Sequence, residues 1–218
     1  MLSHRHSTRA GLATSTHAAG SFVPGLSRRT VIGAALGVGA SVAAGPVWAA
    51  PDEELATLLR TGGVVAVFRH ALAPGTFDPP GFRQGVCSTQ RNLSDEGRNQ
   101  ARRTGEWFKA RQLQPTRVLS SPWCRCVDTA TLAFGTTDVW PALGSPRGYS
   151  ETTGDAHLRE LRRNLVAAST QPGFQVWVTH MFVLSDLVQT GSSSGEALIL
   201  RADAKGNPQI LARFPAVV

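Results

Sequence analysis

The sequence predicts an α/β fold: a three-layer sandwich with helices on both faces of a central, mostly parallel β-sheet. Strand-like and helix-like segments alternate from residue 64 onward, and this alternation is typical of parallel βαβ units. The run Val64–Phe68 is apolar at every position, which indicates a strand covered on both faces. A second strong strand is predicted at Phe174–Thr179. Because ligands of such folds bind outside the carboxyl ends of the strands, the residues after these two strands are the first candidates for a binding site.

The segment after the first strand is a long loop. Residues 71–85 are rich in Gly and Pro and too many for a simple turn, and loops of this kind in compact domains are often functional. A helix is predicted next, with Ser94 as its N-cap. Asp95 and Glu96 form an acidic first turn, and Ala101, Gly105 and Phe108 lie on one face of this helix.

The rest of the chain continues the alternation. The predicted elements are a short strand at Val118–Leu119, a helix with Ser121 as N-cap and Pro122 as first residue that stops at Gly135, an edge strand at Val139–Trp140, a helix from Asp155, the strand Phe174–Thr179, a short helix closed by Gly191, and a hairpin around residues 205–207.

The first 49 residues have the layout of an export signal, and residues 50–218 are predicted to form one domain. The segment SRRTV at 27–31 resembles a twin-arginine signal, an apolar run follows at 31–44, and small residues precede a predicted cut after Ala49. We therefore expect a periplasmic or secreted protein with no membrane span after leader removal. The apolar run is short for a spanning helix, and an uncleaved anchor is the alternative.

Charge argues against a nucleic-acid partner. The net charge is +7, but four arginines lie in the first fifty residues, which contain no acid. The remaining 18 Lys and Arg face 15 Asp and Glu, whereas nucleic-acid binding needs a concentrated basic face. The sequence predicts no oligomeric state.

The three cysteines are expected to face an oxidising compartment, where disulfides persist. Cys124 and Cys126 are separated by one residue and pair poorly with each other, so a link from Cys87 to Cys124 or to Cys126 is one interpretation. Small buried packing residues are the other. A C-x-C pair without a second ligand pair does not match zinc spacing, and no metal site is predicted.

Two arginines and two histidines are expected to converge at the carboxyl ends of the strands. Arg69 and His70 follow the first strand, His180 follows the late strand, and Arg125 lies near the start of a helix, where backbone N–H groups favour an anion. Phosphate is the best candidate, because guanidinium groups bind it through paired hydrogen bonds. A histidine held neutral by nearby cations can also take a phosphoryl group on one ring nitrogen.

Four motifs resemble the histidine phosphatase superfamily, also called the phosphoglycerate mutase-like family. They are Arg69-His70-Ala71, LSDEGRNQA at 93–101, SPWCRCVDTA at 121–130, and VWVTH ending at His180, and together they cover most of residues 60–200. The resemblance, to a small exported branch 1-type member, implies a phosphoglycerate mutase-like fold. It implies that His70 is the nucleophile that becomes phosphohistidine, that Arg69, Arg125 and His180 bind the phosphoryl oxygens, and that no metal or organic cofactor is needed.

The sequence departs from the family pattern in three ways. Ala71 replaces the glycine after the first histidine, and Met181 stands where a glycine often follows the second. The Glu that many members use as general acid cannot be aligned. Asp78, Glu151 and Asp155 are the candidates, and small members of the family include some that lack this acid.

The first functional hypothesis is an exported, metal-independent phosphatase whose substrate is a small-molecule or glycan phosphomonoester, such as a phosphorylated envelope sugar. The alternative is a catalytically inactive phosphate-binding module of the same fold. The two lost glycines favour the alternative, and the intact set of Arg69, His70, Arg125 and His180 favours the enzyme.

Overall fold

The computed structural model describes residues 51–145 and 154–217. Their helices are α1 (Pro51–Thr61), α2 (Asp95–Ala110), α3 (Cys124–Phe134), α4 (Asp155–Ser169) and α5 (Met181–Val188), with short 3-10 helices η1 (Cys87–Thr89) and η2 (Pro141–Leu143). Their strands are β1 (Val64–Arg69), β2 (Arg117–Ser120), β3 (Asp138–Val139), β4 (Phe174–Thr179), β5 (Ala197–Ala202) and β6 (Pro208–Phe214).

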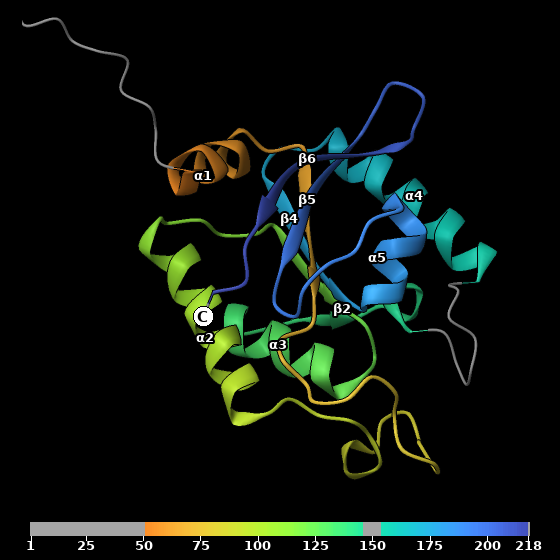
Figure 1. Ribbon diagram of the computed structural model, residues 1–218. Helices are drawn as coiled ribbons and strands as arrows, with labels where there is room; N and C mark the ends of the chain where they lie inside the picture. Colours follow the sequence, from red (N-terminus) through yellow and green to blue (C-terminus); the bar gives the residue numbers. More distant parts are fainter. Residues whose placement is uncertain (1–50, 146–153, 218) are drawn as a thin grey trace, which may run out of the picture. The chain divides into compact units, whose positions relative to one another are not determined.

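The six strands form one sheet in the order β3-β2-β4-β1-β5-β6. The pairs β2–β3, β2–β4 and β1–β4 are parallel, whereas β5 is antiparallel to both β1 and β6. The predicted layered α/β fold with a largely parallel sheet is therefore confirmed (Figure 1). The predicted hairpin is the β5–β6 pair at one edge.

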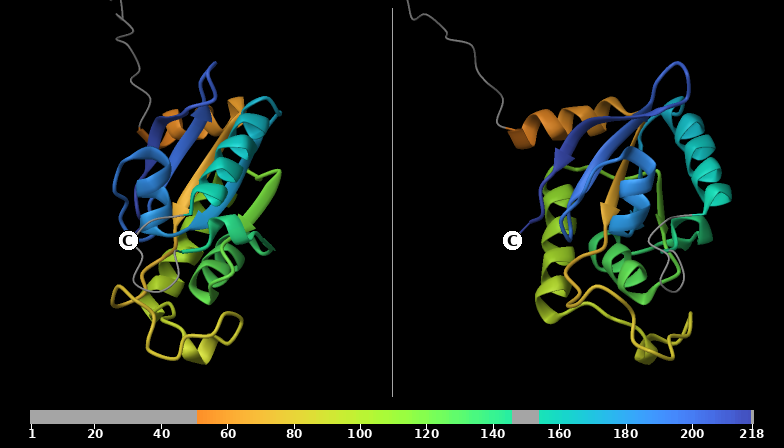
Figure 2. Two further views of the ribbon diagram at one scale, coloured as in Figure 1. Left: turned by 90° about the vertical axis from the view of Figure 1, so that its right-hand side faces the viewer. Right: turned by 45° about the vertical axis from the view of Figure 1, so that its right-hand side comes forward.

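Helices cover both faces of the sheet (Figure 2). Because side chains alternate along a strand, Val64, Ala66 and Phe68 of β1 enter one core with residues of α1, α2 and α3. Val65 and Val67 enter the other core with α4 and α5. The all-apolar first strand is thus explained by burial on both faces, and the polar residues after it emerge at the carboxyl edge of the sheet.

Three local features differ from the sequence analysis. Helix α1 was not predicted, and its apolar residues Leu55, Ala56 and Leu59 are part of the first core. Helix α3 begins at Cys124 with Trp123 as N-cap, not at Ser121 and Pro122, because the hydroxyl of Ser121 is engaged by the ring of His180. Helix α5 is capped by Gln189 in a left-handed conformation, two residues before the predicted Gly191.

The N-cap Ser94 is confirmed, since its side chain accepts a hydrogen bond from the backbone N–H of Gly97. The predicted leader, residues 1–49, lies outside the described residues. Within the ranges described, no helix is both long and apolar enough to cross a membrane.

Candidate active site

The two predicted histidines lie side by side because β1 and β4 are parallel neighbours. Arg69 pairs in register with Thr179, so His70 and His180 both emerge directly after their strands. The backbone N–H of His70 donates to the carbonyl oxygen of Thr179 at 2.9 Å, and the two imidazole centroids are 5.5 Å apart.

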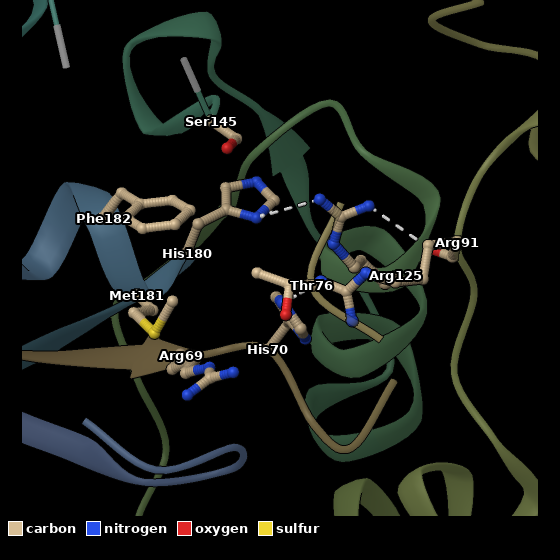
Figure 3. A pocket seen from close by; sticks show the side chains of 9 residues that line it. All are labelled: Arg69, His70, Thr76, Arg91, Arg125, Ser145, His180, Met181 and Phe182. Carbon is tan, nitrogen blue, oxygen red and sulfur yellow. Dashed lines mark hydrogen bonds between the residues drawn. The ribbon is translucent and has the colours of Figure 1, made fainter. Parts of the chain in front are cut away.

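The histidines form part of a pocket with about 490 Å³ of empty space, some of it open to solvent. All four predicted residues line this pocket. Its full lining is Arg69, His70, Thr76, Arg91, Arg125, Ser145, His180, Met181 and Phe182 (Figure 3). No described residue of the lining is a carboxylate, so the described walls carry positive charge only.

One ring nitrogen of His70 is fixed by the backbone. Its Nδ1 lies 2.8 Å from the carbonyl oxygen of Ala71, an acceptor, so Nδ1 carries the ring proton. The lone pair is left on Nε2, which faces Nη2 of Arg91 at 3.4 Å. Burial, followed by the charge of Arg125, lowers the pKa of His70 well below its ordinary value of 6.5. The imidazole is therefore neutral, with Nε2 as its nucleophilic atom.

Two sequence motifs hold the backbone that follows β1. The N–H of Ala71 donates to Oγ1 of Thr129 at 3.0 Å, and the N–H of Leu72 donates to Oε1 of Gln100 at 3.0 Å. At Gly97 a Cβ would collide with the carbonyl of Leu72. The polar and glycine positions of the two motifs thus position this backbone segment.

The two replaced glycines cause no backbone strain. Among the described non-glycine residues, positive φ occurs at Gln112 and Gln189, and neither Ala71 nor Met181 is among them. Ala71 is buried, and its N–H and carbonyl both have partners. An alanine therefore fits at this position without distorting the pocket.

Asp78 binds Arg125 and does not line the pocket. Its carboxylate accepts hydrogen bonds from Nη1 and Nη2 of Arg125 at 2.8 and 3.2 Å, from Nε1 of Trp123 at 2.9 Å, and from the backbone N–H of Arg91 at 2.9 Å. The structure thus gives Asp78 the position of an anchor for Arg125, with its oxygens already occupied.

The other two acid candidates are placed differently. Asp155 is exposed at the start of α4 and is absent from the pocket lining. Glu151 lies outside the described residues.

Arg91 is a third pocket arginine that the sequence analysis missed. Its Nη1 donates to the carbonyl oxygen of Ala73, and its Nη2 faces His70. Burial, followed by the charge of Arg125, lowers the pKa of Arg91 to about 10, which leaves it protonated at neutral pH. The unusual length of its loop was a signal, but no spacing singled out this arginine.

The three pocket arginines are incompletely paired. The Nε atoms of Arg69, Arg91 and Arg125 are buried and have no hydrogen-bond partner. A buried donor without an acceptor costs about 1–3 kcal/mol. An oxyanion among these guanidinium groups would supply acceptors and offset their mutual repulsion.

A disulfide joins the Arg91 loop to the start of α3. Cys87 pairs with Cys124, not with Cys126, and the bridge spans a sequence separation of 37. The N–H of Cys124 also donates to Oε1 of Gln90 at 3.0 Å. Arg91 and Arg125, each close in sequence to one half-cystine, are thereby held against each other.

Cys126 is a free, buried thiol. Burial raises the pKa of Cys126 to about 12. Its Sγ lies 3.5 Å from Nε2 of His180 and 3.5 Å from the carbonyl oxygen of Thr179. The thiol therefore stays protonated and packs beneath the second histidine.

His180 is held by Ser121. The Ser121 Oγ lies 2.7 Å from Nε2 of His180 and accepts a hydrogen bond from the N–H of Trp123 at 3.3 Å. Nδ1 of the same ring is 3.4 Å from Nη2 of Arg125. A guanidinium nitrogen can only donate, so the hydrogen bond from Arg125 requires the lone pair of this ring on Nδ1 and its proton on Nε2, directed at Ser121 Oγ. Ser121 and Arg125 therefore fix both the orientation and the tautomer of the His180 ring.

Burial, followed by the charge of Arg125, also lowers the pKa of His180 well below its ordinary value of 6.5. Arg69 lies at the end of β1, and its Nη1 donates to the carbonyl oxygen of Ser192 at 2.8 Å. Among the residues that the structure describes, no group of three or more His, Cys, Asp or Glu side chains could hold a metal ion.

Residues 68–146 match the model of the histidine phosphatase superfamily (branch 1). No curated protein matches the chain significantly.

Several solved structures share the fold at low sequence identity. The protein histidine phosphatase SixA complexed with tungstate has 19% identity and a TM-score of 0.52, covering 70% of this chain and 97% of its own. A mutant phosphoserine phosphatase from Entamoeba histolytica, in complex with phosphoserine, has 14% identity and a TM-score of 0.51, covering 69% and 95%. A mycobacterial glucosyl-3-phosphoglycerate phosphatase complexed with VO3 has 18% identity and a TM-score of 0.51, covering 71% and 99%.

Proposed function

We propose, from the premise that this chain is a member of the histidine phosphatase superfamily (branch 1), that it is an exported, metal-independent phosphoric monoester hydrolase. In this proposal His70 forms a phosphohistidine intermediate, and Arg69, Arg91, Arg125 and His180 bind the phosphoryl oxygens.

The observation that carries the proposal is one neutral imidazole nitrogen among three guanidinium groups. Nε2 of His70 has its lone pair free because Nδ1 donates to the carbonyl of Ala71. Arg69, Arg91 and Arg125 line the same pocket and attract a dianion. The arrangement therefore brings a phosphoryl group to a nucleophile while stabilising the negative charge of the transition state.

The reaction proceeds in two balanced steps. Nε2 of His70 attacks phosphorus, a P–N bond forms, and the P–O bond to the leaving group breaks, with its electron pair going to the leaving oxygen. That oxygen takes a proton from water. A water molecule then attacks phosphorus and gives a proton to the hydroxide left by the first step, the P–N bond breaks with its electron pair returning to Nε2, and orthophosphate is released.

A phosphorylated envelope sugar is the substrate we propose, and its support is the leader. The twin-arginine-like segment at 27–31 and the short apolar run at 31–44 favour export, which separates the protein from cytoplasmic substrates. The disulfide between Cys87 and Cys124 agrees with an oxidising compartment.

The alternative, a phosphate-binding module without turnover, rested on the loss of two glycines. Neither Ala71 nor Met181 has a positive φ, so the loss of the two glycines does not by itself favour an inactive protein.

The test is phosphate release from p-nitrophenyl phosphate in the presence of EDTA. We expect turnover by the wild-type protein and by His157→Ala, a matched control because His157 is exposed on α4. His70→Ala should lose turnover by a factor of about 10³ or more. Turnover that survives in His70→Ala would refute the assigned nucleophile. Phosphate binding without turnover of any phosphomonoester would favour the binding module.

A further inference from the structure

One side of the pocket is apolar. Met181 and Phe182 line the same pocket as His70, and they lie across it from Arg91 and Arg125 (Figure 3). Both side chains belong to the first turn of α5, directly after His180. Met181 and Phe182 therefore form an apolar wall of the phosphate pocket.

Phe77 extends this apolar surface away from the phosphate pocket. It belongs to the loop after β1, and its ring stacks on that of Phe182 with centroids 6.5 Å apart and an interplanar angle of 13°. Phe77 is 56% exposed, an unusual degree for a phenylalanine beside a pocket. The two rings come from separate elements, so their parallel faces form a surface that neither element provides alone.

The described lining has no charge other than that of its arginines. Thr76 and Ser145 are its neutral polar members, and Met181 and Phe182 its apolar ones. The arginines suit the phosphate of a substrate, and the remaining walls suit an uncharged group.

We propose that Phe182 and Phe77 form a subsite for the leaving group, and that the substrate is a phosphomonoester whose leaving group is an uncharged ring with a flat apolar face. An aryl ring and the carbon-bound hydrogen face of a sugar ring share this chemistry. The inference rests on the proposed function, because it takes the arginine-lined pocket as the phosphate site.

The chemistry of displacement supports this position. In an in-line displacement the leaving oxygen lies opposite the attacking Nε2 of His70, so the leaving group extends from the phosphate away from His70. Phe182 lines the same pocket as His70 and His180, on the side opposite Arg91 and Arg125 (Figure 3). Stacking on an aromatic face combines apolar burial with favourable ring contacts.

The test measures binding of non-hydrolysable phosphonates, so it does not depend on turnover. Inorganic phosphate, methylphosphonate, phenylphosphonate and cyclohexylphosphonate are titrated into the full chain by calorimetry, at a pH where all are dianions. We expect phenylphosphonate to bind about tenfold more tightly than methylphosphonate, from burial of one ring face. Cyclohexylphosphonate distinguishes an aryl leaving group from a sugar. If it binds at least as tightly as phenylphosphonate, the subsite accepts a saturated ring such as that of a sugar, and weaker binding indicates an aryl group.

Variants locate the effect. Phe182→Ala should remove most of the preference for the ring, and Phe77→Ala should remove part of it. In both variants the affinity for phenylphosphonate should fall by more than the affinity for inorganic phosphate. Val166→Ala is the matched control, because Val166 is a half-exposed apolar residue on α4, outside the pocket lining. It should leave every affinity unchanged.

Two failures have different meanings. If all dianions bind but the ring gives no advantage, or if the advantage survives in Phe182→Ala, the aromatic subsite is refuted and the phosphate site stands. If inorganic phosphate itself does not bind, the proposed function fails and the subsite fails with it.

Discussion

The pocket has two halves that are built in different ways. Arg69 is the last residue of β1, and His70 and His180 directly follow β1 and β4, where hydrogen bonds of a buried parallel sheet fix them. Arg91 lies in the loop after β1, and Arg125 lies at the start of α3. This second half is held by the carboxylate of Asp78 and by the Cys87–Cys124 disulfide. We call these the strand half and the loop half.

In the proposed function, the strand half contains the nucleophile His70, and the loop half contains the arginines Arg91 and Arg125 that bind the phosphoryl group. The strand half presents a neutral imidazole in a fixed orientation, and its position depends on sheet register. The loop half supplies most of the positive charge, and its position depends on a few long-range contacts. Disturbing those contacts should weaken phosphate binding and transition-state stabilisation while the imidazole of His70 stays in place.

The largest effect is expected from Asp78→Ala, which disturbs the loop half and leaves the strand half intact. This change removes the partner of a buried guanidinium, since the side chains of Arg125 and Asp78 are 3% and 16% exposed. We expect a loss of stability of about 3 kcal/mol. We also expect kcat/KM to fall by about 10²-fold, because Arg125 loses its orientation. Chemical denaturation and steady-state kinetics measure the two effects.

Asp78→Asn is the matched variant. It keeps the size of the side chain and part of its accepting capacity, so its losses should be smaller than those of Asp78→Ala. If Asp78 is instead the proton donor to the leaving group, Asp78→Asn should be as inactive as Asp78→Ala, with little change in stability.

The strand half was predictable, whereas most of the loop half was not. Arg69, His70 and His180 could be found because apolar runs reveal buried strands, and parallel strands end at one edge. The same logic placed Arg125 near the strand ends. Arg91 and the anchoring position of Asp78 depend on how a long loop folds back, and no periodic pattern records such contacts.

Breaking the disulfide that joins the Arg91 loop to the start of α3 is the second test. The double variant Cys87→Ser/Cys124→Ser removes a bridge across a sequence separation of 37. The chain-entropy model gives a stability loss of about 3–4 kcal/mol for a loop of this size. We expect the KM for phosphomonoesters to rise as Arg91 becomes less ordered, and reduction of the wild type by dithiothreitol should reproduce both effects.

Cys126→Ser is the control for the double variant. Its thiol is free and buried beneath His180, so the change leaves the bridge intact. Dithiothreitol should still lower the stability of Cys126→Ser and raise its KM, because this variant keeps the disulfide. If reduction leaves the stability and the KM of the wild type unchanged, the loop half does not depend on the bridge.

The strand half makes the protein sensitive to acid. The pKa values of His70 and His180 are lowered in the folded state, chiefly by burial. Below the ordinary pKa of 6.5 the unfolded chain binds protons that the folded protein does not, so stability falls as pH decreases from there. With two such groups the slope approaches about 2.7 kcal/mol per pH unit. Denaturation curves between about pH 7 and pH 5 measure it.

His180→Asn should remove about half of this slope, and His157→Asn, at an exposed position, should leave it unchanged. An unchanged slope in His180→Asn would contradict the assignment of a buried neutral imidazole.

Ser121 gives the smallest expected effect. It was predicted to cap α3, yet its hydroxyl lies 2.7 Å from Nε2 of His180. Ser121→Ala removes the acceptor that holds the ring proton on Nε2, and we expect kcat to fall by about tenfold with a smaller change in KM. Ser121→Thr should restore most of the activity. Long-range proton–nitrogen NMR of the His180 ring reads the tautomer directly, and a proton on Nδ1 in the wild type would refute this role.

Ser121 also shows that a local capping signal can be overridden by a long-range contact. Ser-Pro ahead of a helical pattern is a good N-cap signal. Here the helix starts after Trp123, because the serine hydroxyl serves a side chain 59 residues away. Ser94 obeys the same rule, because its hydroxyl accepts from the N–H of Gly97 in the first turn of α2.

The most direct test of the account is the position of phosphate on the protein. Rapid quenching of the wild type during turnover of a labelled phosphomonoester, followed by peptide mapping and phosphorus NMR under alkaline conditions, identifies the modified atom. Since Nδ1 of His70 donates to the carbonyl of Ala71 at 2.8 Å, the account predicts an acid-labile phosphoryl group on Nε2 of His70. A phosphoryl group on Nδ1 of His70 or on His180, or turnover with no phosphoenzyme on any timescale, would contradict it.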